Sequence, residues 1–398
     1  MLTRNSLIIR LIHIAGLTAL LVVNPAHGQE RDFDLPAGEF SEFTSDGGLE
    51  LADAEFTGSP MKRFAEKWPD DLVIAPIPGR SPQVGWTLAL AGGYFLESKN
   101  EDAEHAPSII GGFGWYAENG SYAYGAGGNL HLLDDDLRVK FGAGYMDVQY
   151  RFYGVGDTLS DLGVSVDIVQ EAPMYFASAS YRVWRKLYVG LGYVAGTVDS
   201  RVKFTIEDPF FDPVLKLDIG AITIPIVVDS RDHEQFPRQG WLINGRTMLY
   251  RKNVGGDFDA ETFMISANRY IPIRESDVLA FRGYFRTTAG DNPPFFIMST
   301  FGGSTDLRGY PSGRYRDKMM YALQGEYRWQ LNDKWIFTGF AGFGEVAGDV
   351  SEFGRDFLPA AGLGARFVVS QKHRVSLSFD VARGKHDTEY YFGVGEAF

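Results

Sequence analysis

The chain has 398 residues, a formal net charge of −13 and no cysteine. The acidic balance argues against a nucleic-acid partner, which binds through an excess of Lys and Arg, and the lack of cysteine excludes a disulfide framework. Aromatic residues make up 14% of the chain and 47 residues are glycine. This composition is typical of a transmembrane β-barrel, and a secreted soluble β protein is the alternative.

The first 70 residues predict two segments that precede the fold. Arg4 is followed by an apolar run over 7–23 and by small residues within 26–28, which is the pattern of a secretory signal peptide. We therefore predict a signal peptide over 1–28. Residues 29–70 are polar and acidic, and they predict a periplasmic lead that is disordered or forms one short helix. Such a lead is too short to hold a domain with a sizeable core.

From residue 71 to residue 398, apolar and polar side chains alternate, as they do along β-strands. In 317–330, one face carries apolar and aromatic residues: Tyr321, Leu323, Tyr327 and Trp329. The other face carries polar ones: Gln324, Glu326 and Arg328. A charged face opposite an apolar face fits a polar lumen and surrounding lipid, whereas the inner faces of a β-sandwich would be apolar. We therefore predict an all-β transmembrane barrel over 71–398.

The alternation predicts sixteen antiparallel strands. They cover residues 71–80, 84–96, 108–117, 121–132, 137–151, 165–183, 187–203, 216–230, 240–251, 258–270, 277–288, 317–330, 334–346, 357–369, 373–383 and 388–398. An even number places both ends of the barrel on one side of the membrane. Short connections such as 133–136 then fall on the periplasmic side, and the longest connection, 289–316, is extracellular.

The first predicted strand carries Pro76 and Pro78, which cannot donate hydrogen bonds to a β-ladder. Because the first and last strands of a closed barrel pair with each other, we predict a poorly bonded seam between strands 1 and 16. The alternative is that 71–80 is only a lead-in and that the barrel begins at Val84.

Several motifs resemble one family. The segment FGGSTDLRGY at 301–310 resembles the loop motif of the bacterial surface-antigen domain, which is found in the BamA and TamA outer-membrane barrels. DSRDHEQFPRQGW at 229–241, RFYGVG at 151–156 and AGLGARF at 361–367 are similar to further motifs of that domain. The matches run in the expected order to the C-terminal Phe398.

The resemblance implies that the long extracellular loop folds back into the lumen. The lumen-loop motif would comprise Gly302, Gly303, Leu307, Arg308, Gly309 and Tyr310. Arg308 would dock on acidic or polar groups of strands 12 and 13, because a guanidinium in a partly dry lumen needs a carboxylate. The candidate lumen partners are Glu326, Arg328, Arg366 and Asp380. The family commonly carries an Asp in strand 13, and Gly342 stands about where that Asp would lie.

No residue pattern predicts catalysis, a metal or a cofactor. The strand-turn motif comprises Asp229, Arg231, Asp232, Pro237 and Gly240. Its acidic residues resemble an acid–base or metal cluster, but a Gly- and Pro-containing periplasmic turn explains them more simply. The seven histidines show no metal-ligand spacing, and no serine-hydrolase constellation is present. We therefore predict that the protein is not an enzyme.

The C-terminus predicts a biogenesis signal. Phe398 ends the last predicted strand, with Phe392 and Val394 on the same side and Glu396 interrupting that face. A terminal aromatic residue on the last strand resembles the signal read by the barrel-assembly machinery of the cell. That machinery is therefore an expected partner, together with outer-membrane lipids and a polypeptide client.

The resemblance implies insertion or translocation of protein, or of lipid, at the outer membrane of a Gram-negative bacterium through the first/last strand seam and the LRGY loop. The 29–70 lead has no room for the periplasmic substrate-receiving domains that BamA and TamA carry, so the chain resembles a barrel-only branch. The alternatives are a passive pore or structural surface antigen with a fixed plug loop, and an outer-membrane enzyme.

Overall fold

The computed structural model describes residues 72–81, 84–96, 108–156, 165–203, 214–232, 236–274, 276–300, 302, 306–311, 313–370, 375–394 and 396–398. The predicted signal peptide and the predicted lead, over 1–28 and 29–70, lie outside the described residues. In the described part of the chain, no helix is long and apolar enough to cross a membrane.

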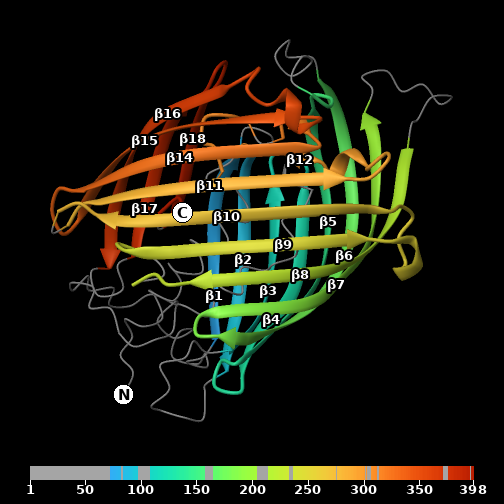
Figure 1. Ribbon diagram of the computed structural model, residues 1–398, viewed down its shortest axis with the longest axis horizontal. Helices are drawn as coiled ribbons and strands as arrows, with labels where there is room; N and C mark the ends of the chain where they lie inside the picture. Colours follow the sequence, from blue (N-terminus) through green and yellow to red (C-terminus); the bar gives the residue numbers. More distant parts are fainter. Residues whose placement is uncertain are drawn as a thin grey trace, which may run out of the picture.

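Sixteen strands form one antiparallel sheet, which confirms the predicted number (Figure 1). They are β1 (Leu72–Ser81), β2 (Gly85–Leu96), β3 (Ser108–Ala117), β4 (Tyr122–Leu132), β5 (Leu137–Phe152), β6 (Val166–Trp184), β7 (Leu187–Lys203), β8 (Val214–Asp229), β9 (Gly240–Tyr250), β10 (Ala260–Pro272), β11 (Val278–Ala289), β14 (Met319–Gln330), β15 (Trp335–Ala347), β16 (Leu358–Ser370), β17 (Val375–Arg383) and β18 (Thr388–Val394). Each strand pairs with its neighbours along the chain, as hairpin connections require.

The connection between β11 and β14 holds a second, two-stranded sheet. This sheet consists of β12 (Ser299–Thr300) and β13 (Arg316–Asp317), and the 3-10 helix η2 (Phe295–Ile297) precedes it in the same connection. Ser299 pairs with Asp317 and Thr300 with Arg316, so β12 and β13 form the neck of the 301–317 segment. Two further 3-10 helices lie at other strand connections: η1 (Lys252–Val254) and η3 (Val350–Glu352).

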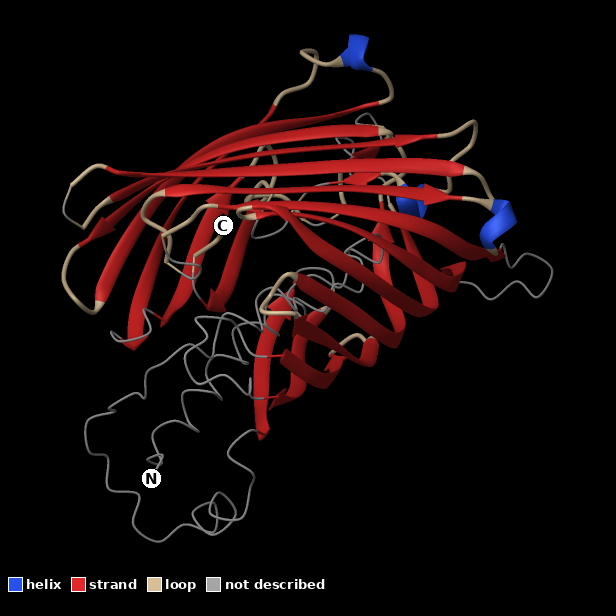
Figure 2. Ribbon diagram, turned by 60° about the horizontal axis from the view of Figure 1, so that its bottom comes forward, coloured by secondary structure: helices blue, strands red, loops and turns tan. Residues whose placement is uncertain are grey.

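The sheet curls around an interior (Figure 2), but it is not closed. Among the described residues, β1 pairs only with β2 and β18 only with β17. The predicted closed barrel is therefore corrected to an open one. Pro76 and Pro78 are two residues apart, so their missing N–H donors face the same edge of β1 and weaken pairing along that edge.

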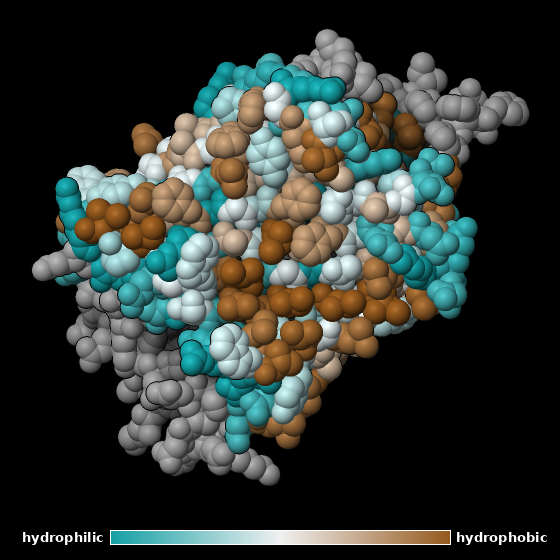
Figure 3. Space-filling model, viewed as in Figure 1, coloured by the Kyte–Doolittle hydropathy of each residue, from teal (hydrophilic) through white to brown (hydrophobic). Residues whose placement is uncertain are grey.

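The two faces of the sheet have opposite polarity. On β14, Gln324, Glu326 and Arg328 are buried, whereas Leu323 and Trp329 are each 45% exposed. Apolar side chains gather across the middle of the outer face (Figure 3), and hydrophilic ones lie at the strand ends. The largest fully buried side chains include four arginines, which is the reverse of a soluble protein core: Arg308, Arg316, Arg328 and Arg366.

Candidate functional site

The tip of the 301–317 segment is buried against the inner face of the sheet. Leu307 and Arg308 are both 0% exposed, and Tyr310 is 1% exposed. Leu307 and Tyr310 belong to a buried cluster with residues of β11, β14, β15 and β16. The tip of the 301–317 segment is therefore packed inside the curled sheet and not on its outer surface. Gly303 lies outside the described residues.

The guanidinium of Arg308 is held on three sides. Its Nη2 lies 2.7 Å from Oε2 of Glu326 and its Nη1 lies 2.8 Å from Oδ2 of Asp380. Its Nε donates to Oε1 of Gln324 at 3.3 Å. Its Cζ lies 3.3 Å from the ring centroid of Phe340, so the flat face of the cation rests on an aromatic ring. A buried Arg with this set of partners is fully compensated in charge.

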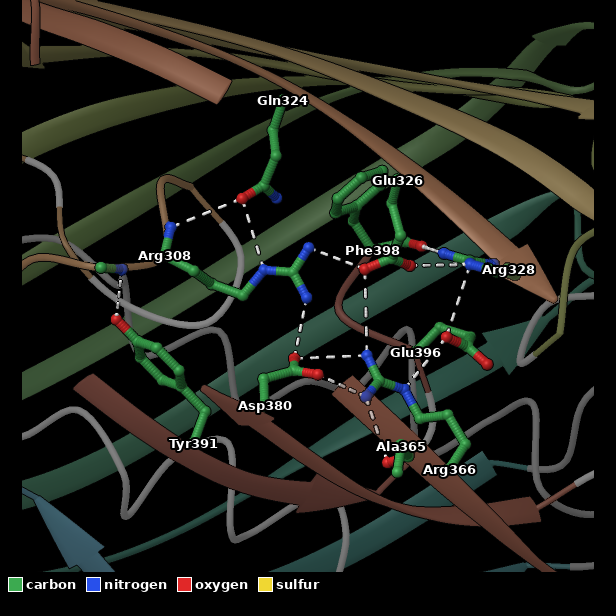
Figure 4. A network of polar contacts seen from close by, with 11 residues as sticks. Arg308, Gln324, Glu326, Arg328, Ala365, Arg366, Asp380, Tyr391, Glu396 and Phe398 are labelled. Atoms are coloured by element: carbon green, nitrogen blue, oxygen red, sulfur yellow. Dashed lines mark hydrogen bonds and ion pairs between the residues drawn. The ribbon is translucent and has the colours of Figure 1, made fainter. Parts of the chain in front are cut away.

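Arg308 is one corner of a closed ring of alternating charges, which we call the charge ring (Figure 4). Its members are Arg308, Glu326, Arg328, Glu396, Arg366 and Asp380. Glu326 joins Arg308 to Arg328, whose Nε is 2.8 Å from Oε1 of Glu326. Asp380 joins Arg308 to Arg366, with 2.5 Å between Arg366 Nη1 and Oδ1 of Asp380.

Glu396 closes the charge ring from the C-terminal tail. Its Oε2 lies 3.4 Å from Nε of Arg328 and 3.2 Å from Nε of Arg366. The four predicted lumen partners, Glu326, Arg328, Arg366 and Asp380, thus all meet in this one cluster, but only the two carboxylates contact Arg308. Asp380 and Glu396 each bridge two arginines, and Glu326 contacts all three, so no charge in the ring is left with a single partner.

The strand-13 contact of Arg308 differs from the expectation. The second carboxylate comes from β17, the fifteenth strand of the large sheet, while β15, the thirteenth, supplies the Phe340 ring. An Asp at Gly342 has no room, because a Cβ there would lie 2.5 Å from the Leu323 carbonyl oxygen and 3.1 Å from Leu307 Cδ1. Leu307 therefore packs against the strand position at which the resemblance led us to expect an acid.

Two glycines of the motif are required by geometry. Gly309 has a φ of +114°, and a Cβ there would lie 2.9 Å from the backbone nitrogen of Gly384. Its own N–H donates to the hydroxyl of Tyr391 at 2.9 Å. Gly302 has a φ of +108°, and a Cβ there would lie 2.6 Å from the carbonyl oxygen of Pro311. The left-handed backbone and these close approaches explain why larger residues are excluded.

The RFYGVG segment lies beside the same loop. The N–H of Gly156 donates to the carbonyl of Arg316 in β13, which forms a β-bridge at 2.7 Å. The rings of Phe152 and Phe295 are 4.9 Å apart. The RFYGVG segment therefore packs against both ends of the connection that carries the loop motif.

The strand-turn motif is a self-contained turn. Both side-chain oxygens of Asp229 accept from the guanidinium of Arg231, and Oδ1 of Asp232 accepts the N–H groups of Arg238 and Gln239. Gly240 has a φ of +107° where β9 begins, and Pro237 is buried beside it. Among the described residues, His, Asp and Glu form no group of three that could hold a metal ion.

The C-terminal tail departs from the predicted strand. β18 ends at Val394 instead of residue 398, and Phe392 lies within it. Beyond the strand, Phe398 packs against the buried Tyr270, Val278 and Ala280. Its backbone oxygen accepts from Nη2 of Arg328 at 2.6 Å. The predicted last strand is therefore wrong over its final residues, because the tail follows the inner charges instead of continuing the ladder.

Sequence reasoning missed several contributors to this cluster. Gln324, Phe340 and Tyr391 each contact the loop tip, and Glu396 completes the charge ring. The available signal for Glu396 was its charge in an otherwise apolar run. No local pattern identifies Phe340 or Tyr391, because aromatic residues are frequent throughout the chain.

An up-and-down antiparallel sheet of sixteen strands, polar inside and apolar outside, defines the class of transmembrane β-barrels. The Omp85 superfamily domain matches residues 173–398. The chain belongs to the Omp85 superfamily, and the resemblance to the BamA and TamA barrels is thereby confirmed. No curated protein matches the chain.

Many solved structures resemble the fold, including the following three. BamA from Haemophilus ducreyi lacking POTRA domains 1-3 is 13% identical with a TM-score of 0.56, over 82% of this chain and 69% of that one. CdiB from Acinetobacter baumannii is 14% identical with a TM-score of 0.51, over 78% and 56%. CdiB from Escherichia coli is 13% identical with a TM-score of 0.55, over 81% and 61%. The chain thus spans less than two thirds of either CdiB protein.

Proposed function

We propose that this protein inserts or translocates polypeptides at the outer membrane of a Gram-negative bacterium. The observation that carries the proposal is the Omp85 domain over 173–398, on a sheet whose first and last strands are left unpaired with each other. Transport of a lipid through the same route is a variant of the proposal. Outer-membrane lipids and the barrel-assembly machinery of the cell are its proposed partners.

The 301–317 loop acts in this proposal as an insert in the barrel lumen. The burial of Leu307 and Arg308 on the inner face supports this role. The exposed apolar residues of the convex face support contact with lipid on the other side, because lipid-facing and lumen-facing residues alternate in such barrels. The charge ring then holds the insert in place by contacts with β14 and β17.

The seam between β1 and β18 is the proposed route for a client. An unpaired strand edge presents backbone donors and acceptors to which another strand can add. Pro76 and Pro78 remove donors from one edge of β1, which keeps permanent pairing weak. A client strand could therefore pair at the seam and leave again.

Locking the seam tests the proposed function. The chain has no natural cysteine, so a disulfide between cysteines placed at Ala75 and Gly393 would be unique. Deletion of the protein should remove one or a few defined client proteins from the outer membrane. The oxidised double variant should cause the same loss. Quantitative proteomics of outer membranes checks this, with the same variant kept reduced and each single cysteine as controls.

The competing function is a passive pore with a fixed plug. The complete charge compensation of Arg308 favours it, since such a site can hold a loop permanently. Unchanged outer-membrane composition in both the deletion and the locked variant would contradict the insertion proposal and leave the pore.

A further inference from the structure

The tail Glu396–Phe398 is docked against side chains of its own sheet. Arg328 donates to the backbone oxygen of Phe398 at 2.6 Å, and the aromatic ring packs on Tyr270, Val278 and Ala280, each 0% exposed. A guanidinium for the backbone oxygen and an apolar patch for the ring hold the aromatic residue of the tail. The sheet therefore fixes this tail through defined contacts at Phe398.

Glu396 ties this bound tail to the loop. Its side chain, 2% exposed, contacts the two arginines that Glu326 and Asp380 also hold. Those two carboxylates are in turn the partners of Arg308. With the tail docked, the three arginines of the charge ring are balanced by three side-chain carboxylates. Without the tail, Glu396 is gone and the same three arginines share two carboxylates.

Removing one carboxylate affects every member of the ring. A buried cation that loses a partner must find another or draw in water, because an uncompensated buried charge is costly. Arg328 and Arg366 would then compete more strongly for Glu326 and Asp380. Both of these carboxylates would be drawn away from Arg308, so the loop tip would be held less firmly.

We propose that the C-terminal tail is a latch for the 301–317 loop, so that undocking of the tail and unseating of Arg308 favour each other. The coupling passes through the shared carboxylates Glu326 and Asp380, and it requires no client and no particular transport function. Linkage makes it reciprocal: whatever loosens the loop loosens the tail by the same factor.

Thiol labelling of the purified, folded protein measures this coupling. In a Leu307→Cys background the only thiol is buried at the loop tip, so its maleimide labelling rate reports how often the tip is exposed. Glu396→Gln should raise that rate at least about twofold, the lower end of the coupling between contacting groups. Glu261→Gln is the matched control, since Glu261 is an exposed acid that pairs with Arg251 at the start of β10.

The reverse experiment tests reciprocity. Ala397→Cys places the reporter on the half-buried tail, and Arg308→Gln should raise its labelling rate by a factor similar to that found at the loop. Heat-dependent migration in gel electrophoresis verifies that each variant is folded. Should Glu396→Gln not fold, Phe398→Ala keeps the side-chain charges, removes the ring that docks the tail, and should still raise labelling at the loop reporter.

Equal labelling of the loop reporter with Glu396→Gln and with Glu261→Gln would overturn the latch. The latch also requires faster labelling of the tail reporter in the Arg308→Gln variant. An unchanged labelling rate there would show that the docking of the tail and the seating of Arg308 are independent. Neither result depends on whether the protein handles a client, so the latch and the proposed function stand or fall separately.

Discussion

At the scale of single residues, the packing of the loop tip depends on the small size of two strand positions. Leu307 fits against β15 because Gly342 and Gly344 have no side chains, and a Cβ at these positions would lie 3.1 Å and 3.2 Å from its methyl groups. The acid that the family pattern places on this strand is replaced by apolar packing. Arg308 takes its second carboxylate from Asp380 instead.

Gly342→Ala should therefore destabilise the protein by roughly 1–3 kcal/mol, the usual cost of an overpacked site. The added methyl group would lie 2.5 Å from the Leu323 carbonyl oxygen, which is backbone and cannot turn away. Gly339→Ala is the matched control on the same strand, because its nearest atom is Leu363 Cδ2 at 3.8 Å. Urea titration of the folded protein in vesicles measures both, and equal stability of the two variants would contradict the packing argument.

At the scale of an element, the turn between β4 and β5 is strained and stabilised by one carboxylate. Leu133, Asp134 and Asp135 have φ values of 55°, 54° and 63°, a left-handed conformation that costs non-glycine residues free energy. Asp135 accepts from His131 at 2.6 Å, from Arg138 at 2.7 Å and from Tyr188 at 2.7 Å. The sequence predicted this short connection but not that Asp135 holds it in place.

The same carboxylate predicts an acid-sensitive turn. Burial of Asp135 raises its pKa, but the hydrogen bonds from His131 and Arg138 outweigh burial and hold the pKa well below its ordinary value. A lowered pKa in the folded state means that the ionised carboxylate stabilises the fold above the unfolded-state pKa of about 3.9, and that this stabilisation is lost as the pH falls through the folded-state pKa.

Asp135→Asn should thus cost about 1.5–3 kcal/mol at neutral pH, the range for hydrogen bonds to a charged group. The difference from the native protein should shrink as the pH is lowered below about 4. Asp134→Asn is the control, since Asp134 is exposed in the same turn. Unfolding free energies measured from pH 7 to pH 3 decide this, and a pH-independent difference would rule out the carboxylate as the anchor.

At the scale of the whole molecule, the polarity of the two faces predicts how the protein meets its surroundings. Leu363 lies within β16 and is 72% exposed, a large apolar side chain at the middle of a strand. If the convex face contacts lipid, Leu363→Arg should reduce the free energy of folding into vesicles by about 2–4 kcal/mol. Leu331→Arg, at the exposed turn after β14, should cost about 0–1 kcal/mol.

Equal costs for these two arginines would place the Leu363 position in water and contradict a lipid-facing sheet. The comparison is sharp because both native residues are exposed leucines and differ only in their position along the strand direction. It also separates a membrane barrel from a secreted soluble β protein, since water solvates an exposed Arg equally well at either position.

The sequence by itself determined what depends on neighbours along the chain. The strand number and the polarity of each face follow from a period of two, which fixes the side of the sheet on which Glu326 or Leu323 lies. Turn glycines such as Gly240 were likewise readable, because local backbone geometry demands them. The resemblance of the LRGY motif to the surface-antigen domain also singled out Arg308, and the alternation along its strand placed Glu326 on the lumen face as a candidate partner.

Only the tertiary structure decided which inner-face residues meet. Asp380 is 72 positions from Arg308 along the chain, and Tyr391 is 82 positions from Gly309. The curl of the sheet and the inward course of the tail bring them together, and neither leaves a periodic trace in the sequence. The pairing with Asp380, the Phe340 ring and the inclusion of Glu396 therefore depend on the radius and opening of the curled sheet, which no local pattern of side chains encodes.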